Sequence, residues 1–212
     1  MTNFIPVFPL GIVVYPGEKV NLHIFEPRYK QLINECVTGS KTFGIPVMME
    51  HALQDLGTQV RVAEIVKTYD NGEMDISIEG LEVFRILEVI RSMPEKLYSG
   101  AIVNYPANDR HNRSSTMKRI LENIRNMHQL LNISKDFKKP DEALTSYDVA
   151  HHIGLTLQQE YEVLELLLES QRLEYIKRHL AKTIPVLQEA KSLVEKVKLN
   201  GHFKNLDSSE WQ

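Results

Sequence analysis

Apolar and polar residues alternate in three short stretches of the first half of the chain, and each stretch predicts a strand with one buried face. Turn residues such as Pro16-Gly17, Gly57 and Pro94 separate the apolar runs, which is typical of a β-rich domain. A further strand is expected at residues 43–48. The alternating apolar positions are Val20, Leu22 and Ile24, then Val60 and Val62, then Met74, Ile76 and Ile78.

A tight hairpin is predicted at Asp70-Asn71-Gly72-Glu73, between the second and third of these stretches. Asn-Gly is favoured in type I′ turns because both central residues of such a turn need a positive φ. We therefore expect the strands on either side of Asn71-Gly72 to pair with each other.

One helix is expected inside the β-rich part, at residues 27–37. Pro27 suits a first helical position, and the Glu26 carboxylate is expected to cap the free amides there. Gly39 is a suitable terminator. The apolar face of this helix consists of Tyr29, Leu32, Ile33 and Cys36.

After Tyr105-Pro106 the pattern changes to a helical period. A first helix has an apolar face from Met117 to Leu131, with Ser114 or Ser115 as its cap. A short helix is expected at residues 146–153 before Gly154, and another begins at a capping box of Thr156 and Gln159. The last helix is expected over residues 170–199, before Gly201, with a kink at Pro185. Its inward positions are Leu173, Ile176, Leu180, Ile184, Leu187 and Val194.

These patterns predict an α+β fold with a β-rich part at residues 1–106, a helical bundle at residues 107–200 that ends in a long helix, and a tail at residues 201–212. The 25 basic and 28 acidic residues give a net charge of −3, so nucleic acid is a poor candidate partner. The single cysteine, Cys36, cannot form an internal disulfide and is expected to be inert packing in a reducing, cytoplasmic setting. The sequence shows no signal peptide and no membrane-spanning run.

The sequence contains no motif for catalysis or metal binding. A phosphate-binding loop needs a Gly-Lys pair and a serine hydrolase elbow needs Gly-x-Ser-x-Gly, and the chain has neither. His151 and His152 are adjacent and diverge on a helix, so we expect one solvent-facing and one half-buried histidine. His23 and Glu26 lack a neighbouring nucleophile. We therefore expect a protein that is not an enzyme and needs no cofactor or metal.

Several motifs together resemble the substrate-recognition domain of Lon proteases, in its free-standing bacterial form without the ATPase and peptidase. The resemblance covers residues 4–190 and is sharpest in the first half. It is carried by the runs Ile5-Pro6-Val7-Phe8-Pro9-Leu10, Val13-Val14-Tyr15-Pro16-Gly17, Leu22-His23-Ile24-Phe25-Glu26-Pro27-Arg28-Tyr29, Phe43-Gly44-Ile45, Leu56-Gly57-Thr58-Gln59-Val60, Asp70-Asn71-Gly72 and Ile78-Glu79-Gly80-Leu81-Glu82-Val83-Phe84-Arg85-Ile86.

The resemblance implies a barrel similar to pseudouridine-synthase-associated (PUA) domains, followed by a helical bundle. It also implies a non-catalytic module that binds unfolded or damaged protein segments, either as an adaptor for a separate protease or as a chaperone-like binder. Aromatic side chains near turns make good peptide anchors. Candidate peptide contacts are therefore Tyr15, Pro16, Gly17, Phe25 and Tyr29, with the alternative that Phe25 and Tyr29 are simply core.

Two other functions stay open at this point. The β-rich part could hold a small-molecule pocket, although no polar cluster identifies a ligand. RNA binding is the third hypothesis, which a PUA-like barrel raises and the acidic β-rich half disfavours. The sequence does not determine the oligomeric state, the client proteins or the involvement of a separate protease.

Overall fold

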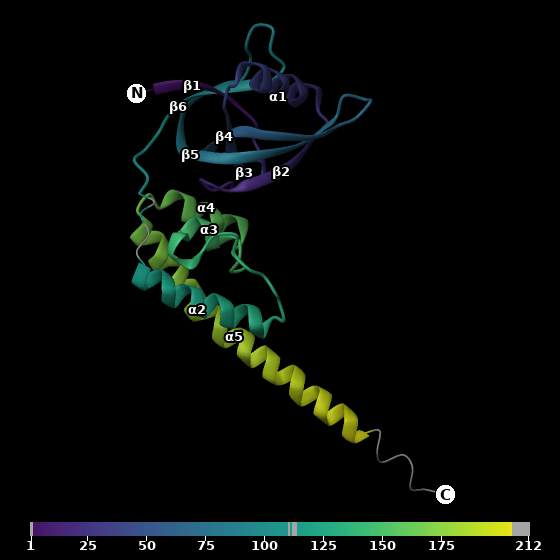
Figure 1. The fold of residues 1–212 in the computed structure, drawn as a ribbon, viewed down its shortest axis with the longest axis vertical. Coiled ribbons are helices and arrows are strands. Elements are labelled where there is room, and N and C mark those ends of the chain that lie inside the picture. Colours follow the sequence, from purple (N-terminus) through teal and green to yellow (C-terminus); the bar gives the residue numbers. More distant parts are fainter. Residues whose placement is uncertain (1, 110, 112–113, 205–212) are drawn as a thin grey trace, which may run out of the picture.

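The computed structural model describes residues 2–109, 111 and 114–204 and has two parts (Figure 1). A β-rich part comes first, and a helical part follows along the chain. The elements are β1 (Thr2–Val7), β2 (Lys19–Ile24), α1 (Pro27–Gly39), β3 (Phe43–Met49), β4 (Ala52–Thr68), β5 (Met74–Ile90), β6 (Ser99–Asn104), α2 (Ser114–Leu130), the 3₁₀ turn η1 (Asp141–Ala143), α3 (Ser146–Ala150), α4 (Leu157–Glu165) and α5 (Glu169–Lys204).

The six strands form one sheet in the order β2-β5-β4-β3-β1-β6, and an additional pairing of β5 with β6 closes it into a barrel. Closure is possible because β4 and β5 are each 17 residues long. Each is long enough for different segments of the same strand to pair with different neighbouring strands. The first half of β5 pairs with β2 and its second half pairs with β6. The α+β fold expected from the sequence is confirmed, with β1 and β6 as strands that the alternation did not reveal.

The inner faces of β2, β5 and β4 supply the main core of the barrel. Leu22 lies opposite Ile76 and Val62 lies opposite Ile78 on this face, as the alternation predicts. The predicted apolar face of α1 packs against them, and Tyr29, Leu32, Ile33 and Cys36 are all buried. In Figure 1, α1 lies on the side of the barrel that faces away from the helical part.

The hairpin between β4 and β5 is confirmed, but its turn is not of type I′. Asn71 is not among the residues with positive φ, whereas Gly72 has a φ of 75°. The Gly72 amide donates to the Tyr69 carbonyl, and the Tyr69 amide donates to the Glu73 carbonyl. Glycine therefore follows the turn in the left-handed conformation, as in a three-residue hairpin loop with a bulge.

Two details at the ends of α1 differ from the sequence prediction. Glu26 occupies the N-cap position, but its side chain makes no capping hydrogen bond and instead pairs with Arg28 at 2.7 Å. At the other end the helix includes Gly39, and Ser40 adopts the left-handed conformation with a φ of 50°. The Arg28 guanidinium therefore competes with the amides of the first turn for the Glu26 carboxylate.

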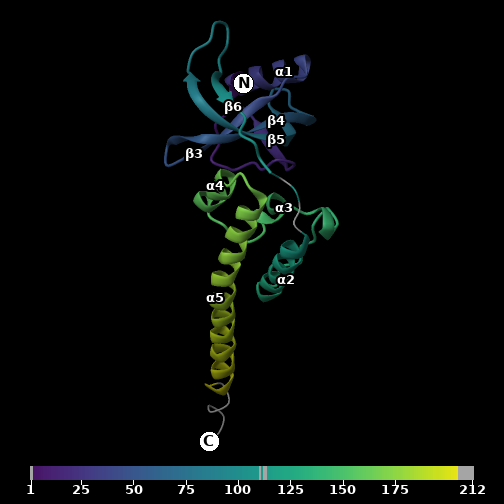
Figure 2. The same ribbon diagram turned by 90° about the vertical axis from the view of Figure 1, so that its left-hand side faces the viewer.

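The helical part is built on α2 and α5, which lie side by side in both ribbon views (Figures 1 and 2). The capping box of Thr156 and Gln159 is confirmed. The short helix α3 ends at Ala150, before a turn that finishes at Gly154 with a φ of 71°. A serine cap on α2 cannot be assessed, because the residues that precede this helix and the Ser114 side chain lie outside the described part of the chain.

Helix α5 is longer than predicted and continues through Pro185 and Gly201 to Lys204. Its second half extends away from the body, and Val194, which was predicted to face inward, is 53% exposed. Leu131 likewise lies beyond the end of α2 and is 44% exposed. The tail predicted at residues 201–212 is thus helical up to Lys204, and its remainder lies outside the described residues.

Candidate peptide-recognition surface

Tyr15 and Pro16 are both buried, and Tyr15 lies between the β-rich part and the helical part. The Tyr15 side chain has no exposed surface, stacks on Tyr147 at 5.0 Å and donates from its hydroxyl to the Glu160 carbonyl at 2.9 Å. Gly17, by contrast, is exposed, and its φ is 86°. The structure therefore places the Tyr15 side chain where a peptide bound at the surface does not reach it.

The loop that carries Tyr15 is held against β5 by Gly80. The Gly17 amide donates to the Gly80 carbonyl, and the Gly80 amide donates to the Glu18 carbonyl, each at 2.8 Å. A side-chain carbon at position 80 would lie 2.2 Å from the Tyr15 carbonyl oxygen. Only glycine allows the loop at residues 15–18 to lie this close to β5. Gly80 therefore helps to hold Tyr15 between the two parts of the molecule.

Phe25 and Tyr29, the other two predicted contacts, have opposite environments. Tyr29 is core: it is 6% exposed and stacks on Phe8 with ring centroids 3.7 Å apart. Phe25 is 58% exposed and stacks against His23 at 6.1 Å. The alternative that both residues are core is therefore correct for Tyr29 and wrong for Phe25.

Phe25 belongs to an aromatic surface cluster that the sequence did not indicate, formed by Phe25, His23 and Tyr69. The edge of the Tyr69 ring meets the His23 ring at 5.8 Å. His23 and the Tyr69 hydroxyl contact opposite oxygens of Asp75, each at 2.7 Å. The hydrogen bond to Asp75 is the main reason why the pKa of His23 is raised above its ordinary value. Because β2, β4 and β5 pair side by side, this cluster combines residues that are far apart in the sequence.

A single apolar cluster joins the two parts of the molecule, and we call it the junction. From the β-rich part it contains Val13, Tyr15, Val47, Leu56 and Val83, and from the helical part Tyr147, Ala150, Tyr161, Val163 and Leu164. The hydroxyl of Tyr161 accepts a hydrogen bond from the Leu56 amide across it. The two parts therefore share a hydrophobic core at the junction.

His151 also links the two parts, at the edge of the junction. Its ring nitrogens contact Glu160 at 2.7 Å and Glu18 at 3.1 Å, and the ring packs on Tyr15 at 4.6 Å. Burial alone lowers the pKa of His151, but the hydrogen bonds to Glu160 and Glu18 outweigh it and raise the pKa to about 9. The sequence prediction of one solvent-facing histidine is wrong, because His151 and His152 are both half-buried.

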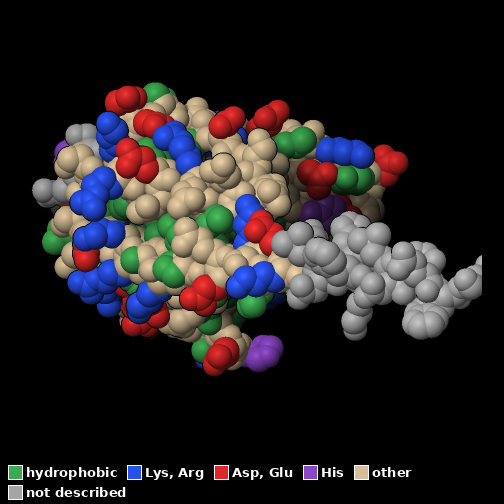
Figure 3. Space-filling model, turned by 90° about the horizontal axis from the view of Figure 1, so that it is seen from below, with side chains coloured by type: hydrophobic (Ala, Val, Ile, Leu, Met, Phe, Trp, Pro, Cys, Tyr) green, Lys and Arg blue, Asp and Glu red, His purple; other side chains and the backbone are tan. Residues whose placement is uncertain are grey.

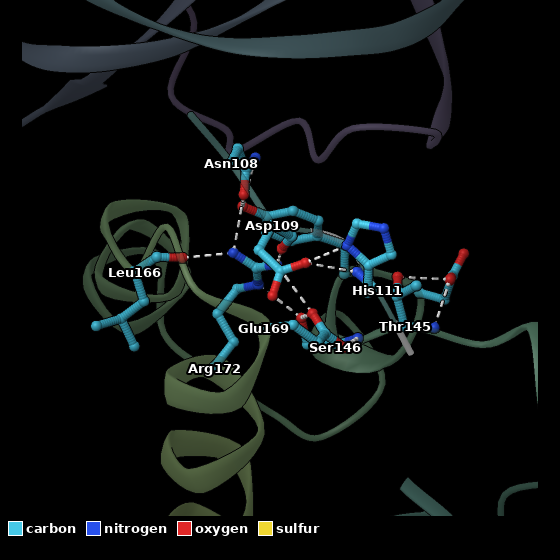
Figure 4. A network of polar contacts seen from close by, with 10 residues as sticks. Asn108, Asp109, His111, Thr145, Ser146, Leu166, Glu169 and Arg172 are labelled. Carbon is cyan, nitrogen blue, oxygen red and sulfur yellow. Dashed lines mark hydrogen bonds and ion pairs between the residues drawn. The ribbon is translucent and has the colours of Figure 1, made fainter. Parts of the chain in front are cut away.

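A buried ion pair fixes the linker between the two parts (Figure 4). Arg172 and Glu169 on α5 have no exposed side-chain surface and lie 2.9 Å apart. Arg172 also lies 4.1 Å above the Tyr147 ring. The guanidinium donates to Ser146 Oγ, Asn108 Oδ1, the carbonyls of Leu166 and Asp109, and Glu169 Oε2. All of its N–H groups therefore have acceptors, and two of these acceptors belong to the linker.

Two hollows flank the C-terminal end of α1, where Cys36, Ser40 and Lys41 line both of them. One has a volume of about 370 Å³ and lies between α1 and residues 61–65 of β4. The other, of about 470 Å³, is bounded by α1, β1 and the loop between β5 and β6, with Phe4, Glu35 and Tyr98 in its wall. The exposed apolar residues Val37 and Ile65 lie at the first hollow.

The described residues bring together no group of metal ligands. Cys36 is a free, buried thiol, and burial raises its pKa to about 11, which suits packing and not nucleophilic chemistry. No helix among the described residues is long and apolar enough to cross a membrane. On the face seen from the C-terminal end, side chains of both charges are interspersed with hydrophobic ones (Figure 3).

The barrel, the helical part and their shared core define a two-part α+β domain, and its described surface combines exposed apolar side chains with shallow hollows. The chain belongs to the family of the ATP-dependent protease La (LON) substrate-binding domain, whose model matches residues 5–182. That match includes both structural parts.

Known proteins with similar sequences or structures agree with this family. A Lon protease of Syntrophomonas wolfei is 24% identical over 87% of the chain, and the chain spans 24% of the length of that relative. The Lon N-terminal domain protein of Xanthomonas campestris has a TM-score of 0.61 at 21% identity, covering 83% of this chain and 98% of that one. The N-terminal domain of a Mycobacterium avium complex Lon protease has a TM-score of 0.63 at 14% identity, covering 85% and 100%.

Proposed function

We propose that this chain is a non-catalytic module that recognises unfolded or damaged protein segments. The observation that carries the proposal is the match of the substrate-binding family to residues 5–182. Recognition of this kind uses apolar surface and open strand edges, and it needs no cofactor. A reducing, cytoplasmic location is part of the proposal, since Cys36 is a free thiol in the core.

Phe25 is the side chain that we propose as the main anchor on the aromatic surface cluster. It is the one aromatic residue among the five predicted contacts that is exposed, and its backbone is fixed between β2 and α1. An exposed aromatic on a rigid scaffold contributes contact area at a low cost in conformational entropy. Gly17, at the opposite end of β2 from Phe25, stays a proposed backbone contact.

The proposal is tested by measuring the affinity of the purified chain for a fluorescently labelled, permanently unfolded protein, without ATP. We expect saturable binding, an intact client on gels, and about tenfold weaker binding for Phe25→Ala. Phe4→Ala is the matched control, because Phe4 is also exposed, at 47%, on another strand. Binding only to native proteins, or cleavage of the client, would refute the proposal.

We further propose that the module works with a separate protease as an adaptor. A degradation assay with a purified Lon-type protease tests this finer role. We expect the chain to accelerate loss of the unfolded client, and Phe25→Ala to lose most of that acceleration. An unchanged or slower degradation rate would identify a chaperone-like binder instead.

A small-molecule site is the second candidate function, and the hollow of about 470 Å³ beside Tyr98 is the observation that favours it. Its wall combines the apolar Phe4 and Met93 with the charged Glu35 and Lys96, which form an ion pair at 2.7 Å. A ligand that binds only the folded state raises the Tm by mass action. A thermal-shift screen without a single stabilising compound would count against this second function.

A further inference from the structure

Strand β4 has an open edge beside residues 61–67. Strand β3 pairs with β4 only as far as Phe43 opposite Val60, after which the chain toward α1 diverges through Ser40 and Lys41. Residues beyond Val60 still pair with β5 on their other side, from Arg61 opposite Glu79 to Thr68 opposite Met74. We call the space next to residues 61–67, on the side away from β5, the open lane.

The open lane has the length and the walls that an extended peptide requires. At about 3.3 Å per residue, residues 61–67 offer an edge of about 20 Å. The hollow of about 370 Å³ lies between this edge and the C-terminal end of α1. A strand bound between a sheet edge and a helix is the arrangement by which several peptide-binding domains extend their sheets.

The two faces of the open lane differ in polarity. Toward α1, the lane is bordered by Val62 and Ile65 from β4 and by Val37 from α1. Toward solvent, Arg61 pairs with Glu79 at 2.7 Å, and Lys67 lies over the Tyr69 ring at 4.3 Å. A strand added here places alternate side chains against the apolar wall and against this charged surface.

Lys41 adds a further positive charge at the end of the lane nearest β3. It lines the hollow, and among the described residues its ammonium group has neither a hydrogen bond nor an ion pair. Arg61 is paired with Glu79, Lys67 lies opposite Asp75, and Glu64 adds a further carboxylate. The charge of Lys41 therefore favours an occupant with an acidic residue at this end of the lane.

We infer that residues 61–67 of β4 bind an extended client segment as an additional strand, in which apolar residues alternate with polar ones and an acidic residue lies beside Lys41. The apolar side chains of the segment pack against Val37 and Ile65. Main-chain hydrogen bonds to β4 supply the part of the affinity that does not depend on client sequence. This inference rests on the proposed function and specifies its client.

Two irregularities in β4 limit how long the added strand becomes. The pairing with β5 shifts register between Val62 and Glu64 and again between Ile65 and Lys67. Bulges of this kind keep exposed edges from pairing without limit with other edges. The lane therefore binds a short segment weakly and reversibly, which suits a module that has to release its client.

The test uses a labelled octapeptide of alternating valine and glutamate and the same fluorescence anisotropy assay as for the unfolded client. We expect Val37→Glu to weaken binding about tenfold, which corresponds to about 1.4 kcal/mol. Val186→Glu is the matched control, since Val186 is also an exposed helical valine and lies on α5, away from the lane. Ala63→Pro, which fills the edge with a ring that cannot donate, is expected to weaken binding by a similar factor.

Changes in the peptide test the same contacts without altering the protein. We expect an octapeptide with N-methyl groups on alternate amides to lose binding, because it cannot pair with β4. An octapeptide of alternating valine and lysine is expected to bind much more weakly than the glutamate form. The inference is overturned if methylation has no effect, or if Val37→Glu and Ala63→Pro both bind like the unchanged protein. If the unfolded client binds and the octapeptide does not, the inference is overturned but the proposed function stands. If neither binds, the proposed function is overturned as well.

Discussion

Replacement of His151 by glutamine removes a side chain that contacts carboxylates from both parts of the molecule. Glu18 comes from the loop before β2, and Glu160 comes from α4. The groups that face the imidazole are these two carboxylates, the Tyr15 ring and the neighbouring His152. Glutamine retains a hydrogen-bonding side chain but not the positive charge, so the variant isolates the contribution of the charge to stability.

The size of this contribution follows from the pKa of His151, which is about 9 in the folded protein. The difference from the ordinary value of about 6.5 corresponds to about 3 kcal/mol in favour of the folded state. Solvent screening reduces this to about 2 kcal/mol, because 28% of the side chain is exposed. A raised pKa stabilises the fold fully below pH 6.5, and the stabilisation disappears as the pH rises through 9.

The assay is urea denaturation of both proteins between pH 5.5 and 10, followed by circular dichroism. We expect the free energy of unfolding of His151→Gln to be lower by about 2 kcal/mol near pH 6 and to approach that of the unchanged protein near pH 10. The difference between the two curves removes the contributions of all other titrating groups. A difference that stays constant across this pH range would show that the His151 charge does not link the two parts.

Three further perturbations test other parts of the structure. Arg172→Met leaves Glu169 buried without its cation and is expected to lower the free energy of unfolding by about 3 to 5 kcal/mol. Adding Glu169→Gln in the same chain removes the unpaired charge and should restore most of the lost stability. Gly80→Ala forces a carbon to within 2.2 Å of a backbone oxygen and should lower the Tm strongly, whereas Gly11→Ala, whose nearest neighbour would be at 3.7 Å, should not. Cys36 should react with iodoacetamide only as fast as the protein unfolds at pH 8, because its thiol is buried and its pKa is about 11; rapid alkylation of the folded protein would contradict its place in the core.

The main elements could be predicted from the sequence because each depends on a local period. The alternation at Met74, Ile76 and Ile78 identifies the inner face of β5, and these three residues are 3% exposed or less. The period of α1 identifies its buried face in the same way. Strands β1 and β6 escaped prediction because their residues do not alternate strictly, and both strands are paired on two sides inside the closed barrel.

The errors at element ends have a common physical cause. The turn at Asn71-Gly72 and the cap at Glu26 were assigned from local preferences, yet each position had a competing partner. The Glu26 carboxylate pairs with Arg28, and Asn71 lacks the positive φ that a type I′ turn requires at its first central residue. The free energy of a cap or turn preference is comparable with that of one surface ion pair or one turn hydrogen bond. Neighbouring contacts therefore decide which conformation forms.

Tyr15 and Phe25 show why contact residues are harder to predict than strands. Both are aromatic residues beside turns, and a sequence pattern treats them alike. Tyr15 is buried because α3 and the turn after it, which come more than a hundred residues later, cover it with Tyr147 and His151. Phe25 is 58% exposed at the end of β2, where no described element covers it. Burial at such positions is a property of the packing between the two parts and not of the local sequence.

The open lane could not be predicted from the sequence for a related reason. It exists because β3 ends its pairing at Val60 while β4 continues to Thr68, and a difference in pairing length between two strands leaves no mark on the residues of either. The residues that border the lane do carry a signal, since Arg61, Glu64 and Lys67 place charges on one face of a strand whose other face is apolar. Charges on an edge strand prevent pairing with identical edges, because like charges would then meet. Such charges disfavour pairing between two copies of this edge, whereas Lys41 at the end of the lane favours the acidic client residue that we infer.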